Sequence, residues 1–148
     1  MLIRRCFFTL VTIIFYYWVG GAAFSQNFCV SSSQELHDSL QVAAVNEEAD
    51  LIKIVQGNYG GNFHYDSTKG NGIAIQGGYT AGCTERIVDP GNTVLDGGNI
   101  DHVLVVIDHA GGSISIEGLK IQHGSTDYNG AGMWIESSAT TAGGNITI

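Results

Sequence analysis

Residues 51–148 consist of short runs of β-branched and other apolar residues, separated by clusters of glycine, asparagine and aspartate. Within the runs the apolar residues stand at alternate positions, most clearly in Ser113-Ile114-Ser115-Ile116. Such alternation is typical of strands with one buried face, and the intervening glycines allow tight corners. The pattern therefore predicts an all-β fold. The predicted strands are Leu51–Val55, Gly72–Gln76, Thr93–Asp96, His102–Asp108, Ser113–Glu117, Leu119–Gln122, Gly132–Glu136 and Asn145–Ile148.

The runs recur at an even spacing. Residues that begin or centre successive runs are separated by 21, 21, 20 and 21 positions: Ile52, Ile73, Val94, Ile114 and Ile135. A repeat of about 20 residues indicates a solenoid, in which each turn buries its apolar face on its neighbours. Helical repeats need longer amphipathic segments, and leucine-rich repeats need a leucine-and-asparagine pattern that this chain lacks. The spacing favours a parallel β-helix, with a β-sandwich as the alternative.

An amphipathic helix is predicted over residues 32–49, ahead of these strands. Ser32-Ser33-Gln34-Glu35 has the S-x-x-E spacing of a capping box, which satisfies free backbone N–H groups at a helix start. The apolar residues of one face then follow: Leu36, Leu40, Ala43 and Ala44. Because the first turn of a solenoid exposes an apolar cross-section and strand edges, we expect the helix to cap it.

The N-terminal segment 1–25 has the three parts of a cleavable secretory signal peptide. Two arginines form a positive n-region, an apolar run covers residues 6–19, and small residues follow. Ala23-Phe24-Ser25 places small side chains where signal peptidase needs them, which predicts cleavage between Ser25 and Gln26. The alternative is an uncleaved anchor, since residues 6–24 are just long enough to span a bilayer. Cleavage predicts a secreted or cell-surface protein that meets the membrane only through its signal peptide.

The chain beyond residue 25 is strongly acidic. It has 14 acidic residues against four isolated cations, Lys53, Lys69, Arg86 and Lys120, so its formal net charge is −10. Such a chain has no electrostatic footprint for nucleic acid. It is also a poor match for a polyanionic substrate, and its charge mainly promotes solubility.

Cys29 and Cys83 are the cysteines that remain after residue 25. An even number in an exported chain predicts a disulfide between them, and two unpaired buried thiols are the alternative. The bridge requires the two Cα atoms to lie within about 7 Å of each other. It would tie the N-terminal arm to the corner that follows the second predicted strand.

The strand and glycine pattern also carries a family resemblance. It lies in Leu51–Tyr59, Ile75–Cys83, Thr93–Gly98, Ile116–Gly124 and Asn129–Ile135. These segments resemble exported bacterial right-handed β-helix proteins of the pectin-lyase-like and polymorphic-outer-membrane-protein-like families. Ala131 and Met133 depart from the glycine-rich motif of those families. The resemblance covers most of residues 28–148, and it implies a right-handed parallel β-helix.

No catalytic, cofactor or metal site is predicted. Lyases of the pectin-lyase-like fold use a cationic base and Ca²⁺, and its glycosidases use paired carboxylates. The nearest acidic cluster, Asp96, Asp101 and Asp108, has no tight spacing, and Asp96 is expected to bond backbone within its Asp-Gly-Gly turn. His123-Gly124 matches a hydrolase element without its companions, and the histidines lack metal-ligand spacing.

Several aromatic residues have two interpretations. Trp134 and Tyr128 flank the glycine-rich motif, and Tyr59, Tyr65 and Tyr79 fall near predicted corners. On an outer face of a solenoid they would stack on sugar rings, whereas inside it they would fill the core.

The sequence thus predicts a signal peptide at 1–25, an arm and capping helix at 26–50, and β-helix turns at 51–148 that are incomplete at the C-terminus. The last turn has no visible cap, so we expect self-association through it. The expected function is a non-enzymatic, secreted or surface-displayed scaffold with a carbohydrate or cell-surface protein as partner. The alternative is the N-terminal part of a polysaccharide lyase or glycoside hydrolase with catalytic turns beyond Ile148.

Overall fold

The computed structural model of the chain describes residues 26–127, 130–138 and 146–148, so the predicted signal peptide lies outside it. Strands dominate the described residues. The elements are β1 (Gln26–Val30), α1 (Ser33–Val45), β2 (Asp50–Val55), β3 (Gly57–Gly60), β4 (Phe63–Ser67), β5 (Ile73–Tyr79), β6 (Thr93–Asp96), β7 (Leu104–Asp108), β8 (Ile114–Glu117), β9 (Lys120–Gln122), β10 (Met133–Ser137) and β11 (Ile146–Thr147), with short 3-10 helices at Ala81–Cys83 and Pro90–Asn92. Within these residues, no helix has the length and apolarity needed to cross a membrane.

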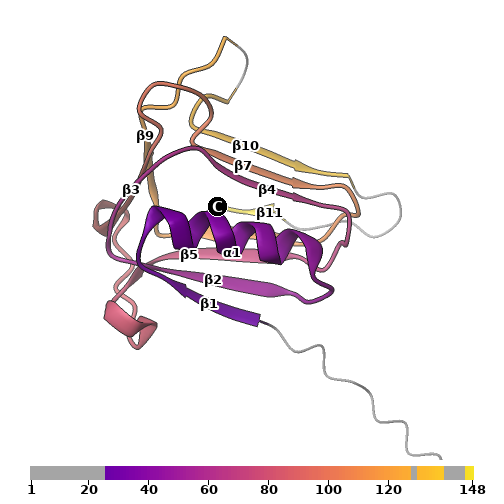
Figure 1. Cartoon of the computed structure of the whole chain (residues 1–148), viewed down its shortest axis with the longest axis horizontal. Helices are drawn as coiled ribbons and strands as arrows, with labels where there is room; N and C mark the ends of the chain where they lie inside the picture. The colour runs from indigo at the N-terminus through magenta and orange to yellow at the C-terminus, as the bar shows by residue number, and fades with distance from the viewer. Residues whose placement is uncertain (1–25, 128–129, 139–145) are drawn as a thin grey trace, which may run out of the picture.

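The strands form three sheets in which every strand pairing is parallel. Sheet A has the order β1-β2-β5-β8-β11, sheet B has β3-β6-β9, and sheet C has β10-β7-β4. The chain visits sheets A, B and C in the same order on each circuit, as β2-β3-β4, β5-β6-β7 and β8-β9-β10. The three sheets surround a common interior (Figure 1).

The even spacing of the apolar runs is not the length of a circuit. Ile52, Ile73 and Ile114 lie on sheet A, but Val94 lies on sheet B and Ile135 on sheet C. In sheet A the register partners run from position 50 to 73, from 73 to 114 and from 114 to 146, so successive circuits differ widely in length. Loops between the sheets, such as residues 80–92, lengthen a circuit without disturbing the ladders of paired strands.

Three of the strands were not predicted from the sequence. β1 forms the edge of sheet A, so the N-terminal arm belongs to that sheet. β3 reads Gly-Asn-Tyr-Gly, and it buries a single aromatic side chain, that of Tyr59. β4 alternates buried Phe63, Tyr65 and Ser67 with exposed polar residues. The alternation of buried and exposed residues is hard to recognise in these sequences, because they contain glycine, asparagine and aspartate, which are usually depleted from strands.

α1 is shorter than the predicted helix and ends at Val45, since the Asn46 N–H closes the last turn on the Val42 carbonyl. At its start, the Ser32 hydroxyl accepts a hydrogen bond from the Glu35 N–H at 3.2 Å. The Glu35 carboxylate returns to the Ser31 N–H, at 2.7 Å, rather than to the capping residue itself. Both ends therefore satisfy backbone groups that the helix leaves unpaired.

α1 lies across the first circuit and contacts β1, β2 and β4 (Figure 1). Leu36 and Leu40, which are 1% and 0% exposed, join the hydrophobic core that the three sheets enclose. Ser39 is also buried, and its hydroxyl donates to the Leu36 carbonyl at 3.0 Å. The stacked circuits form a coil, and the helix covers the apolar interior at the N-terminal end of this coil.

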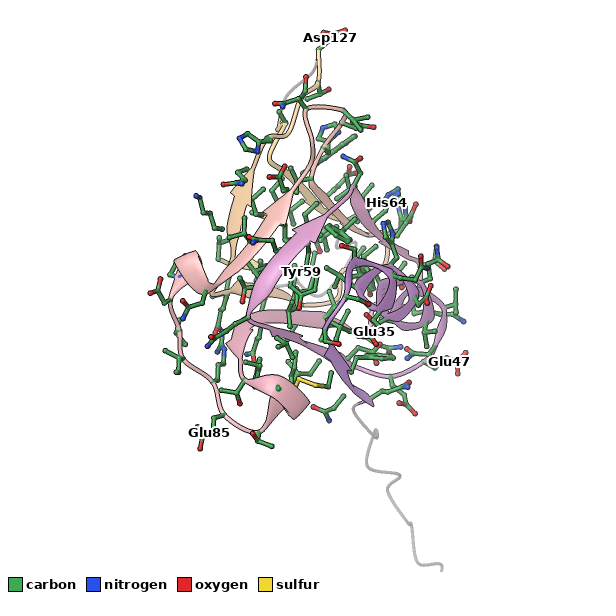
Figure 2. The ribbon with its side chains drawn as sticks, turned by 60° about the vertical axis from the view of Figure 1, so that its left-hand side comes forward. Glu35, Glu47, Tyr59, His64, Glu85 and Asp127 are labelled. Carbon is green, nitrogen blue, oxygen red and sulfur yellow. A yellow bond between two sulfur atoms is a disulfide. The ribbon has the colours of Figure 1, made fainter. Side chains whose placement is uncertain are left out.

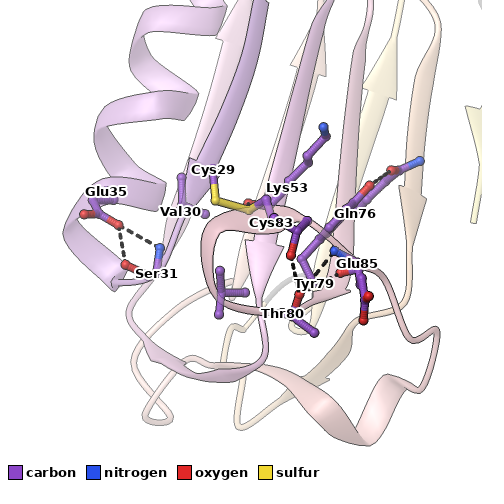
Figure 3. The surroundings of a disulfide bond; sticks show 12 residues. Cys29, Val30, Ser31, Glu35, Lys53, Gln76, Tyr79, Thr80, Cys83 and Glu85 are labelled. Atoms are coloured by element: carbon purple, nitrogen blue, oxygen red, sulfur yellow. Dashed lines mark hydrogen bonds between the residues drawn. A yellow bond between two sulfur atoms is a disulfide. The ribbon is translucent and has the colours of Figure 1, made fainter.

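Cys29 and Cys83 form the predicted disulfide, with their Cα atoms 5.8 Å apart (Figure 3). The bridge attaches the loop 80–92 to β1. The loop is also held to sheet A through Arg86, whose Nη1 lies 3.0 Å from a Glu117 carboxylate oxygen and whose Nε donates to the Gly77 carbonyl. Gly78 has a φ of 94° and lies so close to Ile87 that a Cβ atom would collide with its carbonyl. These contacts hold the loop 80–92, which belongs to the longest circuit, against sheet A.

Candidate binding cleft on sheet C

The outer face of sheet C carries a row of three side chains in register. His64 on β4 and Trp134 on β10 both pair with Val105 on β7. Their neighbours along these strands turn inward, as shown by buried Phe63 and Leu104. Trp134 is 46% exposed, so part of its indole ring is accessible on this face.

A second row follows two residues further along each strand. It consists of Asp66, Ile107 and Glu136, again in register. The Asp66 carboxylate lies 3.0 Å from Nε2 of His109. The outer face of sheet C therefore has an aliphatic centre on β7, flanked on β4 and β10 by polar or aromatic side chains.

Two loops convert the first row into a cleft of about 600 Å³. One loop contributes Ile100, Asp101 and His102 before β7, and the other contributes residues 125–127 after β9. The Ser125 N–H donates to the Asp101 carbonyl at 3.1 Å, which ties the two loops together. The floor of the cleft includes Val105 and Ile107. Figure 2 shows His64 on the outside of the coil and Asp127 on the loop after β9.

Asp101, His102 and Trp134 form a connected group at one side of the cleft. One oxygen of Asp101 accepts the His102 backbone N–H at 2.7 Å and lies 2.9 Å from Nδ1 of its ring. The His102 ring lies 5.5 Å from the Trp134 ring, centroid to centroid, at an angle of 41°. The Asn62 side chain donates to the His102 carbonyl at 2.8 Å. These contacts fix the loop and support the exposed indole.

The Asp101 carboxylate remains accessible, since 63% of its side chain is exposed. The hydrogen bond from the His102 N–H, together with the contact to the His102 ring, lowers the pKa of Asp101. A lowered pKa keeps this group ionised at neutral pH, so that it acts only as a hydrogen-bond acceptor. The cleft therefore combines an aromatic platform and an apolar floor with acceptors at its rim, as in many small-molecule sites.

The three aspartates of the predicted acidic cluster lie in different surroundings. Asp101 lines the cleft, whereas Asp108 is fully buried at the end of β7 and accepts the Ala110 N–H at 2.8 Å. Asp96 ends β6, and its carboxylate accepts the Gly98 N–H at 3.0 Å, as expected for its turn. Among the described residues, no group of three or more His, Cys, Asp or Glu side chains is placed to hold a metal ion.

Asp96 also organises the end of sheet B. Its second oxygen accepts a hydrogen bond from the Gln122 amide at 2.9 Å and lies 2.9 Å from Nδ1 of His123. These partners, led by Gln122, lower the pKa of Asp96 to about 2. His123, the lone match to a hydrolase element, is thus bound to a carboxylate on sheet B and does not line the cleft.

We expect Asp96→Asn to lower the free energy of unfolding at pH 7. A carboxyl whose pKa is lower in the folded chain stabilises the fold above the unfolded pKa of about 4, and the benefit disappears as the pH falls through about 2. Urea denaturation at pH 7, 4 and 2 should show a difference between wild type and variant that shrinks with each step. Asp38→Asn, on the exposed face of α1, controls for loss of a negative charge; an equal effect of pH on both variants would contradict the role of Asp96.

The aromatic residues divide between the core and the surface. Tyr59 and Tyr65 are each 2% exposed and lie inside the coil, as Figure 2 shows for Tyr59, so they cannot stack on a ligand. The Tyr59 hydroxyl donates to the Val55 carbonyl at 2.7 Å, and burial raises the pKa of this residue to about 12. Tyr79 is half-buried beside Lys53 and Arg86, each 5.7 Å from its ring centre. Tyr128 lies outside the described residues.

Sequence reasoning singled out Trp134, and named Asp101 only as part of a loose acidic cluster, but it did not place the other residues in a cleft. His64, Val105 and Ile107 are outward positions of strands whose order in sheet C depends on the true register of the coil. Asp127 lies in an irregular loop with no motif of its own. The available signal was the alternation in Leu104–Asp108, which places Val105 and Ile107 on the face opposite the core.

Comparisons with protein-family models, with curated proteins and with solved structures each found no match to this chain.

Proposed function

We propose that this chain is an exported right-handed parallel β-helix that acts as a scaffold and binds a glycan in the cleft on sheet C. The repeated A-B-C order of parallel strands supports the β-helix. Parallel strands of one sheet are nearly always joined by right-handed connections, which supports the handedness. The Cys29–Cys83 bridge supports an oxidising compartment, and hence export after cleavage between Ser25 and Gln26.

The observation that carries the binding function is the half-exposed indole of Trp134 over an apolar floor. An exposed aromatic ring is favourable when a flat, partly apolar ligand covers it. The rim adds carboxylate and hydroxyl groups from Asp101, Ser125 and Asp127, which can exchange hydrogen bonds with sugar hydroxyls. A pyranose ring has apolar C–H faces and polar edges, so it matches both parts of the cleft.

The resemblance to pectin-lyase-like and polymorphic-outer-membrane-protein-like families remains part of this proposal. Its alternative, a carbohydrate-active enzyme, would use the same cleft to hold its substrate. A cell-surface protein as partner remains a prediction of the sequence.

The binding function is tested with a glycan array and the full chain. Wild-type protein should bind a subset of glycans, and Trp134→Ala should weaken that binding by about 30-fold, equivalent to about 2 kcal/mol for a central aromatic contact. Ile87→Ala is the matched control, because Ile87 is 55% exposed on the loop 80–92, outside the cleft. Binding that both variants retain would place the glycan elsewhere, and no binding by wild type would remove the function.

A further inference from the structure

We infer that the cleft selects neutral glycans and rejects polyuronates. This inference rests on the glycan binding proposed above and adds the chemical class of the ligand. It follows from the charges that surround the Trp134 platform rather than from the platform itself.

Two acidic side chains line the cleft, and two more stand beside it on sheet C. Asp101 and Asp127 belong to its lining, and Asp66 and Glu136 form the polar ends of the neighbouring row on sheet C. All four are exposed. A uronate placed on Trp134 would bring its own carboxylate into a cleft lined by Asp101 and Asp127, and like charges repel one another. A neutral sugar would instead donate its hydroxyl hydrogens to the same oxygens.

The cations that a uronate would need lie elsewhere. Lys53 and Arg86 are placed around Tyr79 on sheet A, and Arg86 is already paired with Glu117. Lys69 pairs with Glu47 at 3.3 Å, and Lys120 is on β9 in sheet B. Among the residues that the structure describes, no lysine or arginine lines the cleft. Recognition of a carboxylate normally depends on such residues, above all on arginine.

The apolar centre of the cleft fits the same conclusion. Val105 stands between His64 and Trp134, and adjacent strands are about 4.8 Å apart, so these two residues flank a strip about 10 Å wide. With a volume of about 600 Å³, the cleft accommodates a short oligosaccharide rather than a single ion. Contact with Val105 and Ile107 stabilises the bound C–H faces of a sugar, because it buries apolar surface. The same contact does not stabilise a charged group, which loses its hydration there.

The test uses the intrinsic fluorescence of Trp134. The sequence has two tryptophans, and Trp18 lies in the proposed signal peptide 1–25, so the processed chain reports on Trp134 alone. Cellohexaose, xylohexaose, hexagalacturonate and fully deacetylated chitohexaose are titrated at pH 7 and 150 mM salt. We expect saturable changes with at least one neutral hexamer, and binding of hexagalacturonate at least 30-fold weaker. Replacement of both Asp101 and Asp127 by asparagine should reduce the difference in affinity between the neutral hexamers and hexagalacturonate. Glu85→Gln, on the loop 80–92, should leave that difference unchanged.

The other outcomes separate the two proposals. Binding of hexagalacturonate as tight as that of the neutral hexamers would overturn the selectivity but leave glycan binding in place. Tighter binding of the cationic chitohexaose would also overturn it, because it would identify the acidic rim as a cation site. If no hexamer changes the fluorescence and the array shows no bound glycan, the proposed function fails together with the inference.

Discussion

Replacing Cys29 and Cys83 together with serine is expected to lower the free energy of unfolding by about 4 kcal/mol. The bridge joins residues 54 positions apart. A cross-link of that span lowers the conformational entropy of the unfolded chain, which stabilises the folded chain by about 4 kcal/mol. In the folded chain the bridge also anchors the loop 80–92 to the edge strand β1, so its loss should loosen both. Urea denaturation of wild type and variant gives the difference directly.

Reduction of the wild-type protein provides the control for the serine substitutions. Dithiothreitol should lower the stability of wild type to that of the double variant and should leave the variant unchanged. A loss below about 1 kcal/mol would contradict this account, because it would mean that the loop stays docked through Arg86 and its neighbours without the bridge.

The second large effect is expected for Leu40→Ala in α1. The Leu40 side chain is 0% exposed and packs in the core that the helix closes. Truncating a fully buried leucine costs about 3 kcal/mol through lost burial and the remaining cavity. Val42→Ala is the matched control on the same helix, because Val42 is 43% exposed and its truncation should cost about 0.5 kcal/mol or less.

Equal losses of stability for Leu40→Ala and Val42→Ala would show that α1 does not seal the first circuit. The difference between the variants is therefore the informative quantity. Exposure of the interior can be followed separately, since a coil that has lost its cap should bind a hydrophobic dye more strongly.

Local signals in the sequence located many of the elements. The alternation in Ser113–Glu117 and His102–Asp108 predicted β8 and β7 to within two residues at each end. Ser32 and Glu35 located the start of the helix, because the physics of a cap acts within one turn. The pairing of Cys29 with Cys83 was predicted because they are the two cysteines that remain after residue 25 of a chain expected to be exported.

The circuits themselves could not be predicted in the same way. Their lengths are unequal because the loops between sheets differ, so the even spacing of apolar runs in the sequence does not match any repeat of the structure. Glycine-rich β3 is a strand because of its partner β6, since its own sequence favours a turn. Tertiary pairing here overrides local preference.

The cleft depends on the register in which β4, β7 and β10 pair, which the sequence did not reveal. His64, Val105 and Trp134 come from three successive circuits and become neighbours only when these circuits stack. Trp134 alone was recognisable, because a tryptophan beside a glycine-rich segment is conspicuous. The acidic rim was visible in the sequence only as a general excess of negative charge.

The central claim is that β4, β7 and β10 stack in the register that brings His64, Val105 and Trp134 into one row beside His102. Nuclear Overhauser effects in isotope-labelled protein test it most directly. The account predicts cross-peaks between the Trp134 indole and both the Val105 methyl groups and the His102 ring, whose centre lies 5.5 Å from that of the indole. A well-folded protein in which the Trp134 indole shows no cross-peak to Val105 or His102 would contradict both the register and the cleft.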